Sequence, residues 1–244
     1  MESHAWNVIA TIQSDFREKF GIPRQSGLVE GLYAKIVFEP EFRNPDALRG
    51  IEGFSHLWLI WQFSKAIRSS WTPTVRPPRL GGNTRLGVFA TRSPFRPNPI
   101  GLSCVRLEAV QVEPGLGSVL IVSGADLLDG TPIYDIKPYL PYTDCRPEAV
   151  GGFAASAPEH KLQVTIPETQ LRMIPEEKRD ALTSLLSLDP RPSYQEDPER
   201  IYGMRFADWE IHFMVQGTLL TVTEIRLSHP EPADPGDFLK NVIT

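Results

Sequence analysis

The sequence predicts a mostly β protein that ends in a small region with one helix and a β-hairpin. Twenty-three prolines in 244 residues favour strands and loops over long helices, because proline interrupts a helix. Residues 31–38 alternate apolar and other side chains with the period of a half-buried strand. By contrast, residues 175–188 combine a first-turn proline, early acids and leucines at helical spacing, a pattern typical of an amphipathic helix.

The first part of the chain is expected to form three strands. Residues 8–12 begin one, and residues 31–38 form a second. Residues 45–51 are long enough for one or two helical turns. Residues 51–63 are apolar nearly throughout, which favours a central strand covered on both faces. The side chains expected on one face of the second strand are Leu32, Ala34, Ile36 and Phe38.

A proline-rich loop is predicted between two further strands, residues 87–90 and 100–107. Pro94, Pro97 and Pro99 each lack an amide donor and push the preceding residue into extended geometry. No helix can form there, so the loop is expected to be stiff. Arginines held on such a loop lose less entropy on binding a carboxylate or a phosphate.

Three aspartates follow the next expected strand, residues 119–122. Asp126, Asp129 and Asp135 lie beside tight turns, where an aspartate most often bonds the local backbone. Together with a nearby lysine and tyrosine, the three are also typical of a pocket rim. The sequence leaves both interpretations open.

The composition divides the chain into a larger and a smaller domain. Residues 1–145 form the expected β domain. Residues 146–165 are rich in proline, glycine, alanine and serine, which is typical of a linker or a surface excursion. Residues 166–244 form a small α+β domain, in which a hairpin of residues 204–215 and 219–227 follows the helix and a loosely held tail ends the chain.

The charges are unevenly distributed. The whole chain has a formal net charge of −5, yet residues 53–107 contain no aspartate or glutamate. Such asymmetry indicates a basic face on an acidic protein and a polyanionic partner, most simply a nucleic acid. The positive residues of this segment are Lys65, Arg68, Arg76, Arg79, Arg85, Arg92, Arg96 and Arg106.

Several common classes of site are not indicated. The sequence has no Gly-x-Gly-x-x-Gly after a strand, no P-loop and no Gly-x-Ser-x-Gly. Cys104, Cys145 and the five scattered histidines show no metal-ligand spacing, so no metal is expected. The longest apolar run, residues 57–61, is too short to span a membrane, and the first residues lack a signal pattern. We therefore expect a cytoplasmic protein.

Six motifs in order point to one family, and two shorter segments, at residues 189–192 and 202–204, extend the likeness. The set resembles the TsaA-like, or TrmO, family of tRNA (adenine-N6)-methyltransferases, also described as YaeB-like. The motifs are Ile22–Gln25, Gly53–Trp58, Thr74–Gly82, Gly87–Arg92, Phe95–Gly101 and Asp129–Tyr139.

The resemblance implies a TsaA-like β-barrel methyltransferase domain outside the Rossmann class, and a homodimer with S-adenosylmethionine near the subunit interface. It implies that threonylcarbamoyladenosine, next to the anticodon of tRNA, is methylated on N6. By position, the resemblance places the cofactor contacts at Pro23, Arg24, Gln25, Ser64, Lys65, Arg92, Leu102, Asp126, Leu127, Leu128 and Asp129.

The acceptor nitrogen of that nucleoside is urea-like, so a base that removes its proton would help. Asp135, His56 and Tyr139 are the candidates, and the sequence does not choose among them; His56 is also typical of a hydrogen-bonded core histidine. The candidates for tRNA phosphates or the threonyl carboxylate are Arg76, Arg79, Arg96 and Lys137. The alternative is a non-catalytic protein on the same barrel that binds RNA or senses S-adenosylmethionine.

Overall fold

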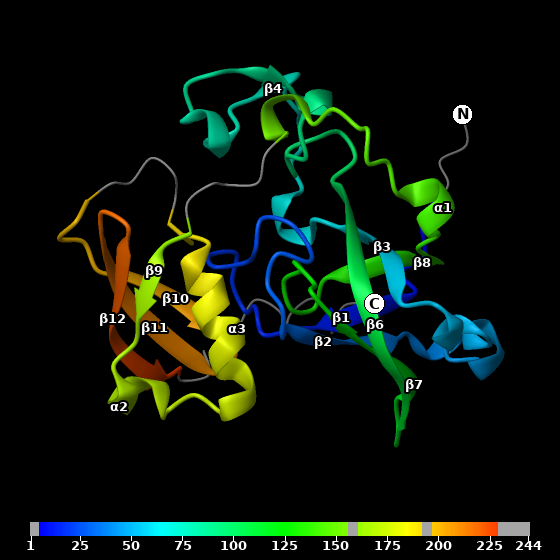
Figure 1. Ribbon diagram of the computed structural model, residues 1–244. Coiled ribbons are helices and arrows are strands. Elements are labelled where there is room, and N and C mark those ends of the chain that lie inside the picture. The colour runs from blue at the N-terminus through cyan, green and yellow to red at the C-terminus, as the bar shows by residue number, and fades with distance from the viewer. Residues whose placement is uncertain (1–4, 156–160, 192–196, 229–244) are drawn as a thin grey trace, which may run out of the picture.

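The computed structural model describes residues 5–155, 161–191 and 197–228. Figure 1 shows two β bodies side by side and a third, smaller segment that stands above them. The mostly β prediction is confirmed.

The larger body is a closed barrel of six antiparallel strands. Its interior is filled by apolar side chains that alternate along each strand, as the period of a strand requires. In order around the barrel, the strands are β1 (Ala10–Gln13), β2 (Tyr33–Phe38), β7 (Gly117–Ser123), β6 (Ile100–Glu113), β3 (His56–Gln62) and β8 (Pro132–Pro138).

The strand predicted over residues 31–38 is confirmed as β2, in which Ala34, Ile36 and Phe38 are buried in the barrel core. Leu32 precedes the strand and is buried in the core of the smaller body instead. The prediction of a strand over residues 51–63 covered on both faces is wrong. Residues 51–53 form a 3-10 turn, and β3 buries only every other side chain, Leu57, Leu59 and Trp61. The reason is that a small barrel has a single core, on the inner side of each strand.

Four short turns and helices lie outside the barrel wall. The helical turn expected near residues 45–51 is confirmed as η2. The turns are η1 (Pro40–Phe42), η2 (Pro45–Leu48), η3 (Ile51–Gly53) and the four-residue helix α1 (Pro141–Asp144).

The connection between β1 and β2, residues 14–32, leaves the barrel and enters the other body (blue in Figure 1). We call it the anchored connection. Phe16, Val29 and Leu32 are buried in the core of the smaller body and at most 3% exposed. Three polar contacts join the two as well: Asp15 O accepts from Ala207 N at 2.8 Å, Glu18 Oε1 accepts from Arg205 N at 3.0 Å, and Asp15 Oδ2 pairs with Lys178 Nζ at 2.5 Å.

The connection between β3 and β6, residues 63–99, is the segment at the top of Figure 1. We call it the basic excursion. Pro77 and Val88 are the residues of this segment that are buried in the described structure. The strand predicted over residues 87–90 is wrong, because three of these residues form a 3-10 turn that is mostly exposed. The elements are η4 (Ser64–Ala66), β4 (Thr74–Val75), η5 (Pro78–Leu80), β5 (Leu86–Gly87) and η6 (Val88–Ala90).

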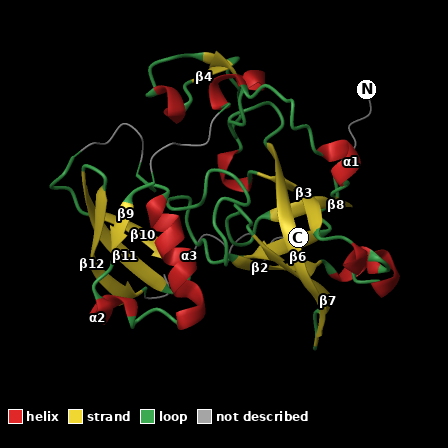
Figure 2. Ribbon diagram, viewed as in Figure 1, coloured by secondary structure: helices red, strands yellow, loops and turns green. Residues whose placement is uncertain are grey.

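The smaller body is a four-stranded sheet with helix α3 on the face turned to the barrel (Figure 2). The predicted amphipathic helix is confirmed: Leu182, Leu185 and Leu186 are buried. In sheet order, the strands are β10 (Tyr202–Phe206), β11 (Trp209–Gln216), β12 (Leu219–Leu227) and β9 (Gln163–Thr165); the helices are α2 (Glu168–Leu171) and α3 (Glu176–Ser187).

The hairpin of β11 and β12 is confirmed, but its predicted start at Met204 is wrong. Ala207, at a φ of 50°, breaks the chain into two strands, so Met204 belongs to β10. The expected linker, residues 146–165, contains the turn η7 (Gly152–Ala154) and strand β9, which pairs parallel with β12. The tail after Ser228 lies outside the described residues.

Candidate functional site

A half-buried carboxyl group at one end of the barrel is the centre of the site. Asp126 follows β7, and its Oδ1 accepts a hydrogen bond from Ser103 Oγ at 2.5 Å. Ser103 is 1% exposed on the inner face of β6 and in turn accepts from Trp61 Nε1 at 3.0 Å. Burial raises the pKa of Asp126, and the Ser103 bond and the Arg92 charge only partly oppose this effect. Asp126 therefore holds its proton more readily than an exposed aspartate.

The anchored connection and the basic excursion meet beside this carboxyl. The Arg92 guanidinium donates to the Gln25 side-chain oxygen. The next residue, Ser26, accepts from the Cys104 amide at 3.2 Å, and its own backbone amide bonds the Asp126 carboxyl. The structure thus brings together three residues that the resemblance places at the cofactor, Gln25, Arg92 and Asp126, from three separate parts of the chain.

Asp129 lies at the other end of the same loop, and its partners belong to the anchored connection, far away in the chain. Its carboxylate accepts from Ser14 N at 2.9 Å and from Arg17 Nη1 at 2.8 Å. Leu127 is fully buried in the barrel core, and Leu128 O accepts from Thr131. The contacts thus give these three positions structural roles: Asp129 joins the loop to the anchored connection, Leu127 fills the core, and Leu128 closes a local turn.

The other expected cofactor residues are spread around this cluster. Pro23 is buried and Arg24 exposed on the anchored connection. Lys65 O accepts from Lys19 Nζ at 2.6 Å, which holds the turn of Ser64 and Lys65 beside that connection. Leu102 is 55% exposed on the outer face of β6, the face opposite to Ser103.

The three candidate bases do not lie with Asp126. His56 and Tyr139 are neighbours outside the barrel wall, with ring centroids 6.2 Å apart. The pKa of Tyr139 is raised, first by loss of solvent and then by the neighbouring Cys145, Cys104 and Asp144, so its phenolate forms less readily than that of an exposed tyrosine. Asp135 pairs with Lys137 at 2.9 Å. In β6, Ser103 points inward and Cys104 outward, towards Tyr139, so the wall of the barrel separates the two groups.

The polar pair behind Asp126, Ser103 and Trp61, was not among the sequence candidates. A signal was present, because the alternation of residues 100–107 places Ser103 with the inward residues of its strand. A serine on the apolar face of a strand needs a buried hydrogen-bond partner. That partner is Asp126, which comes from the loop after β7, so it is known only once the fold brings this loop back to β6.

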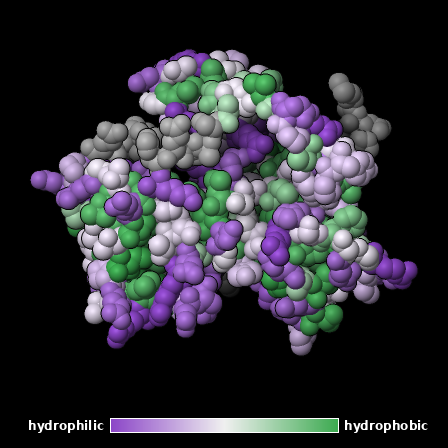
Figure 3. Space-filling view, viewed as in Figure 1, coloured by the Kyte–Doolittle hydropathy of each residue, from purple (hydrophilic) through white to green (hydrophobic). Residues whose placement is uncertain are grey.

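The candidate RNA-binding residues occupy two places. Arg76 and Arg79 are exposed on the basic excursion, and Arg96 is half-buried there, with Nη1 donating to Thr91 O at 3.1 Å. Lys137 belongs to the barrel strand β8. Three of the four predicted contacts thus share one segment. Figure 3 shows hydrophilic side chains around the hollow between this segment, at the top, and the bodies below.

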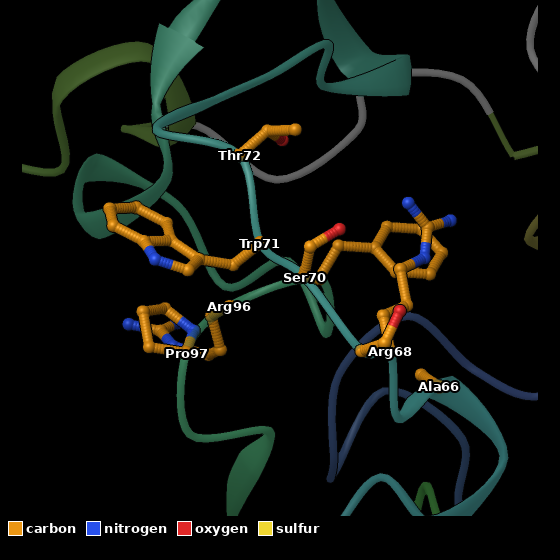
Figure 4. Close-up of a pocket in the computed structure, with 9 residues that line it drawn as sticks. Ala66, Arg68, Ser70, Trp71, Thr72, Arg96 and Pro97 are labelled. Carbon is orange, nitrogen blue, oxygen red and sulfur yellow. The ribbon is translucent and has the colours of Figure 1, made fainter.

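A pocket lies within the basic excursion (Figure 4). Trp71, Phe95, Pro97 and two arginines line it. The guanidinium carbon of Arg68 stands 3.7 Å from the centre of the Phe95 ring, within the range of a cation–π contact. The wall of the pocket is thus partly aromatic and partly positive.

The described residues contain no group of three or more His, Cys, Asp or Glu side chains placed to hold a metal ion. Within that same part of the chain, no helix is long and apolar enough to cross a membrane.

Two family models match the chain. The tRNA-methyltransferase O N-terminal domain matches residues 11–145, and the TrmO C-terminal domain matches residues 159–228.

Similar proteins cover nearly the whole chain. A tRNA (adenine(37)-N6)-methyltransferase of Escherichia coli K12 is 43% identical over 223 residues, which is 88% of this chain and 93% of that protein. A Pseudomonas aeruginosa protein named putative S-adenosylmethionine-dependent methyltransferase RcsF is 42% identical over 86% of this chain and 92% of its own. A crystal structure of TrmO from Pseudomonas aeruginosa matches with a TM-score of 0.74 and 35% identity, over 92% of this chain and 99% of that one.

Proposed function

Because the chain belongs to the tRNA-methyltransferase O family, and is therefore an S-adenosylmethionine-dependent tRNA methyltransferase, we propose that it methylates N6 of threonylcarbamoyladenosine next to the anticodon. The methyltransferase domain is the closed barrel. The observation that supports this assignment best is the meeting of Gln25, Arg92 and Asp126 at the barrel's end.

These residues suit the polar groups of S-adenosylmethionine, which supplies a methyl group already activated by its sulfonium. Arg92 can bind the carboxylate of the amino-acid part, since a guanidinium fits a carboxylate with two hydrogen bonds. Asp126 can accept from ribose hydroxyls or from the amino group. Backbone groups near Pro23 and Leu128 complete the binding site, and Ser64, Lys65 and Leu102 are its outer contacts.

The chain contributes mainly by holding donor and acceptor together, an effect that can supply roughly 7–11 kcal/mol. The acceptor nitrogen must also lose a proton. Asp126 is assigned to the cofactor and stands beside the Arg92 charge, which lowers its basicity, so it is not this base. Asp135, which is paired with Lys137, and His56 and Tyr139 on the outer face of the barrel are the candidates for the role. A pH–rate profile of a variant at each position identifies the group.

The remaining features of the proposal follow from the family and from the charge distribution. We expect a homodimer in the cytoplasm, with the anticodon loop bound along the basic excursion through Arg76, Arg79 and Arg96. The competing function, a binding protein without catalysis, would retain S-adenosylmethionine and RNA and leave both unchanged.

The test is mass spectrometry of nucleosides from tRNA that carries threonylcarbamoyladenosine, after incubation with the protein and S-adenosylmethionine. We expect a nucleoside one methyl group heavier. Arg92→Ala should abolish it, whereas Arg49→Ala, at an exposed arginine outside both connections, should not. If the wild-type protein binds both molecules and leaves every nucleoside unchanged, the binding function is correct.

A further inference from the structure

Three aromatic side chains are exposed on the basic excursion. Trp71 is 49% exposed, Phe89 is 72% exposed and Phe95 is 38% exposed. The rings of Trp71 and Phe89 are neighbours, with centroids 6.1 Å apart and planes 35° from parallel. Large aromatic rings gain more from burial than most side chains do, so neighbouring exposed rings indicate a surface that a partner covers.

The residues around these rings indicate the chemistry of the partner that covers them. Arg68 lies over Phe95, and Arg96 lines the same pocket as Trp71 (Figure 4). No acidic residue occurs from Gly53 to Leu107. A flat apolar surface beside guanidinium groups fits a molecule that has both a planar ring and a negative charge. Unpaired nucleotides have both, because the base stacks on an aromatic ring and the phosphate pairs with arginine.

A second copy of this chain fits the surface less well. Closed dimers are built from the same patch on both subunits. A dimer through Trp71 would therefore bring two basic excursions together, each without a neutralising acid, and like charges at an interface are unfavourable.

We propose that Trp71 and Phe89 form a stacking platform for an unpaired base of the tRNA anticodon loop, and that Arg68 and Arg96, on opposite sides of the pocket in Figure 4, bind separate phosphates of that loop. The platform rests on the proposed function, since it presumes that tRNA is the substrate. It binds a base that flanks the reacting nucleoside, because the pocket beside Trp71 is lined by Ala66, residues 68–72 and residues 95–97, without Asp126 or Arg92.

The experiment measures binding of an anticodon stem-loop at several salt concentrations, with 2-aminopurine in turn at each unpaired position. Trp71→Ala should weaken binding about tenfold at every salt concentration, because stacking is not ionic. Trp71→Phe should retain most of the affinity. The wild-type protein should quench 2-aminopurine at one loop position, and Trp71→Ala should not. Arg68→Ala should reduce the salt slope by about one ion.

The matched control is Trp6→Ala. Trp6 is 59% exposed on the barrel, where its ring meets the edge of Tyr134, so it has the same chemistry outside the basic excursion. We expect unchanged affinity and quenching. Unfolding midpoints equal to that of the wild type verify that each variant is folded.

Each other outcome overturns the platform. Wild-type affinity for Trp71→Ala would show that the ring does not contact RNA. A change of oligomeric state in this variant would show that the surface is a subunit contact. Methylation by the wild type with normal binding by Trp71→Ala would reject the platform alone, whereas Trp71-dependent binding without methylation would reject only the proposed reaction. A wild-type protein that does not bind the stem-loop would reject both.

Discussion

The anchored connection and the basic excursion leave the same barrel and meet at the same site, yet they are held in different ways. The anchored connection buries Phe16, Val29 and Leu32 in the core of the smaller body. The basic excursion is nearly twice as long as the anchored connection, yet its buried residues are Pro77 and Val88. Segments with few buried contacts open at lower free energy. The comparison indicates that the anchored connection holds its side of the site rigidly, whereas the basic excursion, which carries Arg92 as well as the candidate RNA contacts, leaves its side freer to adapt.

Different chemistry suits these two sides. A small cofactor needs fixed groups, because a misplaced donor loses much of the rate enhancement. An anticodon loop has unstacked bases that rearrange on binding, and a segment that adjusts with it can still discriminate. Prolines limit how far the basic excursion moves, since each fixes one backbone angle.

The largest effect is expected from one matched pair of substitutions. Phe16→Ala should lower the free energy of unfolding by about 3–5 kcal/mol, because it opens a cavity in the shared core. Phe89→Ala, at 72% exposure, should change it by less than about 0.5 kcal/mol. Urea unfolding measures both. Equal losses in the two variants would refute the contrast between the connections.

Glycines give a second matched pair. Gly21 and Gly81 both have positive φ, at 89° and 70°, so alanine strains either one by about 1–2 kcal/mol. A Cβ at Gly21 would also lie 2.7 Å from Cε of the buried Met204, whereas nothing lies within 4 Å at Gly81. We expect Gly21→Ala to cost about 2–4 kcal/mol in thermal unfolding. A smaller cost than that of Gly81→Ala would mean that the anchored connection can move.

The carboxyl between the two connections should show a pH effect. The folded-state pKa of Asp126 lies above the ordinary value of 3.8. The protonated carboxyl therefore stabilises the fold fully below pH 3.8, and this contribution is lost as pH rises through the folded-state pKa. Asp126→Asn keeps an oxygen for Ser103 but does not ionise. As pH rises, the free energy of unfolding of this variant should therefore increase relative to that of the wild type. Urea titrations at several pH values measure this difference.

The same substitution should weaken binding of S-adenosylmethionine by roughly tenfold or more, since a hydrogen bond to a charged group is worth about 1.5–3 kcal/mol. Calorimetry measures this affinity. Normal binding by Asp126→Asn would show that Asp126 does not contact the cofactor. A difference in stability that does not change with pH would show that the carboxyl is exposed to solvent.

The smallest effect concerns the ion pair at the junction. Lys178 and Asp15 are 30% and 19% exposed, and Lys178→Ala should cost about 1 kcal/mol. Arg172→Ala removes a more exposed pair within α2 and its next turn, and should cost about 0.3–0.5 kcal/mol. Hydrogen exchange should show faster opening of residues 15–22 in the first variant only. Protection unchanged in both would mean that the apolar core alone holds the connection.

The elements that the sequence predicted well are those whose pattern is local. The alternation of β2, the leucines of α3 and the short gap between the two hairpin strands each specify a structure within a few residues. The error at residues 51–63 arose because an apolar run does not reveal how many faces are covered. Only the closure of the barrel, which pairs β1 with β8, decides that β3 has one buried face.

The site was predictable in part for the same reason. The charge pattern and the family motifs indicated Arg92, Gln25 and Asp126, but not that they meet. Their meeting depends on contacts between residues far apart in the chain, such as Ser103 with Asp126 and Cys104 with Ser26. The placement of His56 and Tyr139 outside the barrel likewise depends on which face of each strand turns inward when the barrel closes.

The shared core has a consequence for the order in which the protein matures during translation. Phe16 is among the first residues to emerge from the ribosome, and its partners Ile211, Val222 and Ile225 are some 200 residues later. At about 5–20 residues per second, the anchored connection is synthesised roughly 10–40 s before the strands that complete its core. A nascent chain can therefore complete its barrel strands early, but it binds the methyl donor tightly only when synthesis of the smaller body is nearly finished.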